Sequence, residues 1–121
     1  MPSSNPILRL EDIPENIGLI EEYTRGLSHE TFVQDRKSQD AAERCLLRIS
    51  EAATKLEGLV EAVIPGQPWS EIRAVGNVLR HEYDRIDPAV IWRIVSPDLT
   101  PLKQAIERAL DNLRRAAPDN A

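Results

Sequence analysis

The stretch that decides the fold is RKSQDAAERCLLRISEAATKLEGLVEAVI, residues 36–64. Its apolar residues recur every three to four positions, so they fall on one face of an α-helix. That face holds Ala42, Cys45, Leu46, Ile49, Ala53, Leu56, Val60 and Val63. We therefore predict a single helix over residues 36–64, the longest in the chain. At 1.5 Å per residue it would be roughly 40 Å long, and its excess surface favours packing against a second copy of the chain.

Two shorter segments precede this helix. Apolar residues at helical spacing predict a helix that ends near Gly26. Either this helix starts near Asp12 with Pro14 in its first turn, or it is kinked at Pro14. Residues 28–34 are typical of a short capped turn that carries Phe32 inward.

Three more helices are predicted after the turn at residues 65–68, Pro-Gly-Gln-Pro. They cover about residues 69–86, a short segment over 88–96, and a last segment from Thr100 onward, with 116–121 as a frayed tail. Because the connecting loops are short, the predicted fold is all-α: an up-and-down antiparallel helical bundle of four main helices plus a short helix.

Composition narrows the class of protein. The chain has 121 residues, of which 41% are hydrophobic and 4% aromatic, with a net charge of −5. This size and composition predict one domain, residues 1–121, whose core is aliphatic. No apolar run is long enough to span a bilayer, so we expect a cytoplasmic protein. Because the chain is acidic, any contact with RNA has to be local. Cys45 falls on an apolar helix face and is expected to be a buried, inert thiol.

Polar residues that could bind a ligand or take part in catalysis concentrate between Arg73 and Asp87. At 100° per residue, Arg73, Asn77, Arg80 and His81 fall on one stripe, with Tyr83 at its edge. Guanidinium groups bind phosphate, an imidazole titrates near neutral pH, and an amide can orient a sugar or phosphate oxygen. This stripe could therefore bind a phosphodiester and move a proton.

A plainer interpretation is that the stripe is the solvated face of an amphipathic helix. The arginines would then pair with nearby acidic residues, for which the candidates are Glu71, Glu82, Asp84 and Asp87. Glu51 is either a solvated charge or reaches the His81 region across two packed helices. His29 is expected at the surface, and no metal site is expected because no second His or Cys lies at metal-ligand spacing.

Several ordered blocks resemble one known family. They are ISEAATKL at 49–56, PWSEI at 68–72, Asn77, HEY at 81–83 and ID at 86–87, flanked by LEDI at 10–13, Phe32 and DL at 98–99. Together they are similar to the HepT branch of the HEPN superfamily. The resemblance implies a helical bundle that dimerises and acts as a metal-independent ribonuclease toxin without a cofactor. It also implies a partner, a minimal nucleotidyltransferase antitoxin that neutralises the toxin by adenylylation.

The resemblance also implies roles for individual residues. The family pattern is an arginine, four residues, a histidine, one residue and a tyrosine. His81 matches the histidine, Tyr83 matches the tyrosine that the antitoxin adenylylates, and Asn77 is the polar residue after the arginine. Gly76 stands where the family has its arginine. Arg80 or Arg73 would then have to supply the guanidinium that holds the phosphate.

Three functions follow as hypotheses. The first is a ribonuclease toxin with RNA as its substrate and His81 as general base or acid. The second is a catalytically impaired helical module that binds a minimal nucleotidyltransferase, with Gly76 as the mark of a lost active site. The third is a purely structural bundle.

Overall fold

The computed structural model describes residues 5–82, 86–97 and 99–116. These residues form seven α-helices and contain no strand, which confirms the all-α prediction. The helices are α1 (Pro6–Thr24), α2 (His29–Phe32), α3 (Arg36–Lys55), α4 (Leu59–Val63), α5 (Trp69–Glu82), α6 (Pro88–Val95) and α7 (Thr100–Ala116). Four of them are the main helices of the prediction: α1, α3, α5 and α7.

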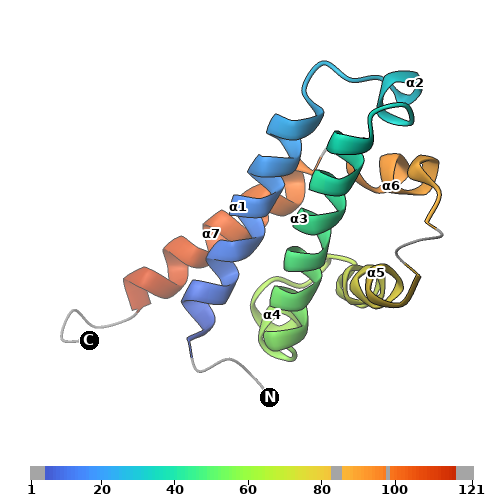
Figure 1. Cartoon of the computed structure of the whole chain (residues 1–121). Coiled ribbons are helices and arrows are strands. Elements are labelled where there is room, and N and C mark those ends of the chain that lie inside the picture. Colours follow the sequence, from blue (N-terminus) through green and yellow to red (C-terminus); the bar gives the residue numbers. More distant parts are fainter. Residues whose placement is uncertain (1–4, 83–85, 98, 117–121) are drawn as a thin grey trace.

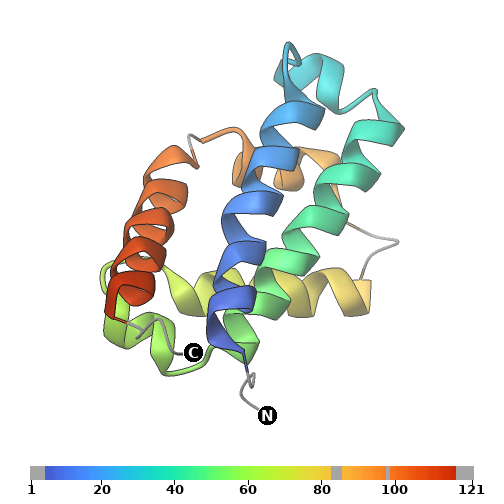
Figure 2. The same cartoon turned by 90° about the vertical axis from the view of Figure 1, so that its left-hand side faces the viewer.

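The main helices pack around α1 and α3. Figures 1 and 2 show α1 and α3 side by side and antiparallel, with α7 along the other flank of α1. Helix α5 lies across the C-terminal half of α3, and α6 lies near α2 and the start of α3. Fully buried aliphatic side chains from α1, α3, α4, α6 and α7 fill the centre, among them Leu10, Ile13, Ile17, Ile20, Ala42, Ala53, Val60, Ile91 and Ile106.

Helix α1 begins at Pro6, which rules out the start near Asp12 that the sequence left open. Asn5 caps it by accepting a hydrogen bond from the Leu8 amide at 3.2 Å, and Pro6 is its first residue. A proline at this position loses no helical hydrogen bond, because its missing N–H would have no partner there. The helix continues through Pro14. Packing of α1 against both α3 and α7 therefore outweighs the cost of an internal proline.

The prediction of one helix over residues 36–64 is wrong. Helix α3 ends at Lys55, and α4 begins at Leu59 after a turn in which Gly58 has a φ of 88°. Glycine adopts this left-handed conformation at little cost and also weakens a helix interior. With 20 residues, α3 is about 30 Å long. Excess helix length therefore gives no support to a dimer.

Other sequence predictions concern single residues and the ends of helices. Cys45 is 1% exposed and burial raises the pKa of its thiol, as expected for an inert cysteine. His29 is exposed at the start of α2. Helix α5 ends at Glu82, so Ile86 is not helical, and Ala116 belongs to α7 and not to a frayed tail. Within the described ranges, no helix has the length and apolar character needed to cross a bilayer.

Candidate functional site: the outer face of α5

Helix α5 is anchored by its apolar side. Trp69 is 3% exposed, and its indole Nε1–H donates to the Ile64 carbonyl at 2.9 Å. One face of the helix also buries Leu79. These residues fix the rotation of α5 about its axis. As a result, part of the predicted polar stripe lies on the flank of α5 that faces α3, and part lies on the outer side of the helix.

Arg73 is held by structural contacts on this flank. Its guanidinium Nη2–H donates to Glu61 Oε1 at 3.0 Å, and Nη1 contacts the other carboxylate oxygen of Glu61. Its Nε–H donates to the Ala53 carbonyl at 3.1 Å. Arg73 thus joins α5 to α3 and α4, and few of its donors are left for a ligand.

The Arg73–Glu61 pair predicts a specific dependence of stability on pH. Hydrogen bonds from Arg73 lower the pKa of the Glu61 carboxyl from 4.5 to about 2. The pair therefore stabilises the fold fully above pH 4.5, and this contribution is lost as the pH falls toward 2. We expect the wild type to be more stable than Glu61→Gln at neutral pH, with the difference vanishing over that range. Denaturant unfolding of both proteins at stepped pH measures it, and a constant difference would contradict the assignment.

Arg80 is the less occupied of the two arginines. Its Nη1 lies 3.8 Å from Glu51 Oε1, and both side chains are more than 40% exposed. Glu51 is thus a solvated charge, and it also reaches across from α3 to the polar stripe, where it contacts Arg80 and not His81. Among the described side chains, the carboxylate partners of Arg73 and Arg80 come from α4 and α3 and not from Glu71 or Asp87, while the candidates Glu82 and Asp84 lie outside the described side chains.

Gly76 lies where α5 packs tightly against α3. It is buried, and a Cβ added there would lie 2.0 Å from Ser50 Oγ and 2.6 Å from Ser50 Cβ. Ser50 is itself fully buried, and its hydroxyl donates to the Arg73 carbonyl at 3.0 Å. The same hypothetical Cβ would lie 3.4 Å from Arg80 Nη1. Thus Ser50 fills the space of a side chain at position 76, and the Arg80 guanidinium lies directly over it.

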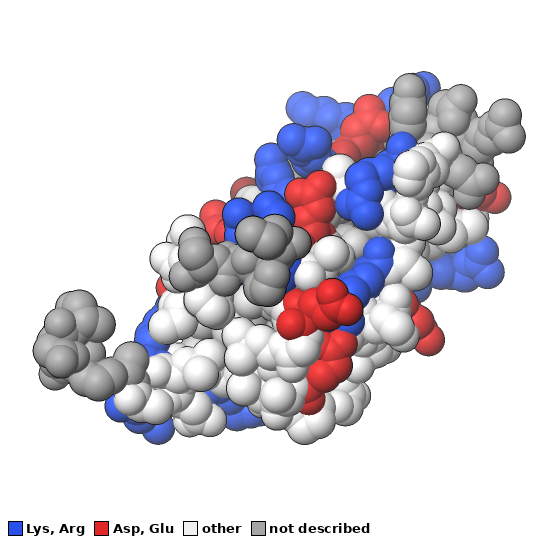
Figure 3. All heavy atoms as spheres, turned by 90° about the horizontal axis from the view of Figure 1, so that it is seen from below, with Lys and Arg blue, Asp and Glu red and all other residues white. Residues whose placement is uncertain are grey.

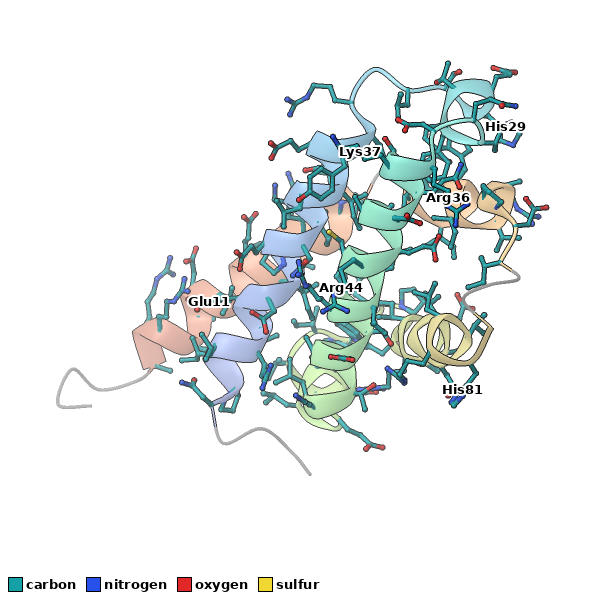
Figure 4. All side chains as sticks on the ribbon, viewed as in Figure 1. Glu11, His29, Arg36, Lys37, Arg44 and His81 are labelled. Carbon is teal, nitrogen blue, oxygen red and sulfur yellow. The ribbon has the colours of Figure 1, made fainter. Side chains whose placement is uncertain are left out.

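His81 and Asn77 lie on the outer side of α5. Both are exposed, and neither has a hydrogen-bond or ion-pair partner among the described residues. Figure 4 shows the His81 side chain pointing away from α3 and α6. Adjacent residues on a helix differ by about 100° in direction, so His81 and Arg80 diverge. Tyr83, the predicted modification site, lies outside the described residues.

The sequence analysis missed two buried polar residues, Ser50 on α3 and Asn16 on α1. Ser50 packs against Gly76, as described above. Asn16 is 5% exposed on the buried side of α1, and its Oδ1 atom has no hydrogen-bond partner. A signal existed for Asn16, because it occupies the apolar register set by Ile13 and Ile20. For Ser50, only the packing of two helices reveals the contact.

The charges around the site are mixed. Figure 3 shows acidic and basic side chains interspersed on the face seen from below. Over residues 5–82, 86–97 and 99–116, no three His, Cys, Asp or Glu side chains gather as metal ligands would.

Comparison with known proteins identifies the family. Residues 13–109 match the model of the family described as "Ribonuclease HepT-like". The "Probable ribonuclease HepT" of Thermococcus cleftensis is 38% identical over 99 residues, which cover 82% of this chain and 90% of the relative. The "Putative RNase MJ1380" of Methanocaldococcus jannaschii is 30% identical over 98 residues, covering 81% and 90%. No solved structure gives a significant match.

These findings agree with an all-helical protein whose candidate site residues lie along one helix. The chain belongs to the HepT-like ribonuclease family.

Proposed function

We propose that this chain is a metal-independent endoribonuclease and the toxin of a cytoplasmic toxin–antitoxin module. Family membership supports the ribonuclease class. The observation that carries the proposal for this chain is the place of Arg80, whose guanidinium lies over Gly76, where the family pattern has its arginine.

The proposed reaction uses groups on the α5 helices of two copies of the chain. A ribose 2′-oxygen attacks the adjacent phosphorus while a general base takes its proton, and the bond to the 5′-oxygen breaks as that oxygen gains a proton. His81 acts as the general base or acid, because an imidazole exchanges protons near neutral pH. Arg80 binds the non-bridging phosphate oxygens, and Asn77 orients a sugar or phosphate oxygen. The products are a 2′,3′-cyclic phosphate and a 5′-hydroxyl.

Replacement of Arg80 tests this assignment. We expect Arg80→Ala to slow cleavage of single-stranded RNA by about 100-fold or more, as when one preorganised donor to a developing charge is removed. Arg93→Ala is the matched control, since Arg93 is an exposed arginine on α6 outside the site. Single-turnover cleavage rates compare the two variants with the wild type. Equal rates for Arg80→Ala and Arg93→Ala would refute the role of Arg80.

A homodimer is part of the proposal. Because His81 and Arg80 diverge on one helix, a second copy is needed to bring more phosphate-binding and proton-transfer groups to one place. Exposed apolar side chains beside the stripe favour such an interface: Val78 is 45% exposed and Val90 38%. They line an apolar groove of about 290 Å³ between α5 and α6.

The proposed partner is a minimal nucleotidyltransferase that adenylylates Tyr83. Negative charge added close to Arg80 would compete with substrate phosphate for the guanidinium and block the site by its bulk. After co-expression with such an enzyme, we expect intact-mass spectrometry to show one or more added adenylates, absent in Tyr83→Phe. An unmodified chain beside an active nucleotidyltransferase would contradict this proposal.

A second candidate function rests on Gly76. If Arg80 does not replace the missing arginine, the chain is a helical module that binds the nucleotidyltransferase without cutting RNA. The two candidates differ in whether the natural chain cleaves RNA at all.

A further inference from the structure

A carboxylate from the neighbouring helix reaches the proposed phosphate-binding arginine. Glu51 on α3 lies 3.8 Å from Arg80 on α5, measured from Oε1 to Nη1. The proposed reaction gives Glu51 no role, and a negative charge beside a phosphate-binding site opposes the binding of RNA. Glu51 therefore lies where it weakens substrate binding unless it acts through Arg80.

The place of Glu51 is fixed by the packing of α3 on α5. Two hydrogen bonds between these helices lie on either side of it along the chain. The Ser50 hydroxyl donates to the Arg73 carbonyl at 3.0 Å, and the Arg73 Nε–H donates to the Ala53 carbonyl at 3.1 Å. Ser50 and Ala53 are also fully buried. The backbone that carries Glu51 therefore has little freedom relative to α5.

The place of Arg80 depends on the absence of a side chain at Gly76. Positions 76 and 80 are one turn apart, and side chains on a helix point back toward its N-terminus, so the Arg80 side chain runs over position 76. The nitrogen that faces Glu51, Nη1, is also the one that lies 3.4 Å from a Cβ built on Gly76. Arg80 donates no hydrogen bond to any described residue, so its N–H groups are available to a phosphate.

We propose that Glu51 is a positioning residue, which holds the Arg80 guanidinium over Gly76 while the N–H groups of Arg80 bind the scissile phosphate. An exposed arginine has many rotamers, and misplacement of a phosphate-binding group slows the chemical step. The two side chains are 41% and 49% exposed, so their ion pair contributes little to stability and acts on orientation. This inference rests on the proposed ribonuclease function and adds a residue to that site.

Glu51→Gln separates positioning from charge repulsion. The variant keeps the shape of the side chain and removes its charge, so repulsion alone predicts tighter RNA binding and cleavage that is no slower. Positioning predicts a rate at saturating single-stranded RNA that falls about tenfold, while the Kd for an uncleavable 2′-O-methyl RNA stays the same or falls. The control Glu107→Gln makes the same charge change at an exposed position on α7 and should alter neither quantity by more than about twofold.

The Arg80→Ala background shows whether Glu51 acts through the arginine. In that background Glu51→Gln should slow cleavage no further, because no guanidinium is left to hold. A further tenfold loss there, or a wild-type rate for Glu51→Gln alone, overturns the inference.

The contact can also be followed without cleavage. In ¹⁵N-labelled protein, the Arg80 Nε–H resonance is assigned by its loss in Arg80→Ala. We expect this resonance to shift in Glu51→Gln and to stay in place in Glu107→Gln. An Arg80 resonance that is unchanged in Glu51→Gln overturns the inference whether or not the chain cleaves RNA. A natural chain that cuts no RNA refutes the proposed function instead, and a shifted resonance then still supports the positioning contact.

Discussion

Replacing Gly76 with alanine is expected to destabilise this protein by roughly 1–3 kcal/mol, the usual cost of overpacking a core. In the interior of an ordinary helix, the same change stabilises by about 0.5–1 kcal/mol. The sign is reversed here because the added Cβ would lie 2.0 Å from Ser50 Oγ and 2.6 Å from Ser50 Cβ, both in a buried contact. Urea unfolding of the two proteins measures the difference.

A double-mutant cycle with Ser50→Gly provides the control. Removing the Ser50 side chain frees the space, so Gly76→Ala should cost less in that background, with a coupling energy of about 0.5–3 kcal/mol. Ser50→Ala should rescue only in part, because the Ser50 Cβ alone is too close. A Gly76→Ala protein at least as stable as the wild type would show that α3 and α5 do not pack as described.

This packing also affects any attempt to restore the family arginine. Gly76→Arg alone introduces the same Cβ and a long side chain into the space filled by Ser50, so its loss of function would be uninformative. The variant that restores the motif is Ser50→Gly with Gly76→Arg.

The second large effect is expected for His81→Ala. We expect RNA cleavage to fall by about 100-fold or more, as for loss of a general acid or base. Stability should change by less than about 0.5 kcal/mol, because His81 is exposed and has no partner among the described residues. Cleavage rates and urea unfolding measure the two quantities.

His29→Ala is the matched control for this experiment. His29 is an exposed histidine on α2, and its removal should leave cleavage unchanged. Equal rates for the two histidine variants would remove His81 from the mechanism.

The sequence predicts the helices well because most of their signals are local. Apolar spacing and capping residues such as Asp35 and Asp87 depend only on neighbours in the chain. The break at Gly58 was missed since the apolar pattern continues through it from Leu56 to Val60. At Gly58 the positive φ turns the chain, and the spacing of apolar residues gives no information about that backbone angle.

The candidate site was predictable only as a stripe on one helix. Periodicity indicates that Arg73 and Arg80 share a flank of α5, but their partners Glu61 and Glu51 come from other elements. These contacts depend on the angle at which α5 crosses α3, and local spacing carries no information about that angle. For the same reason, the sequence alone did not distinguish the structural Arg73 from the available Arg80.

The most direct test of the central claim is a cleavage assay of the purified natural chain on single-stranded RNA in the presence of a chelator. We expect the natural chain, which has Gly76, to cleave the RNA and to leave 2′,3′-cyclic phosphate ends, and we expect this cleavage to depend on Arg80. The Ser50→Gly, Gly76→Arg variant serves as the restored-motif reference. If that variant cleaves RNA and the natural chain does not, Arg80 does not replace the family arginine and the protein is a binding module.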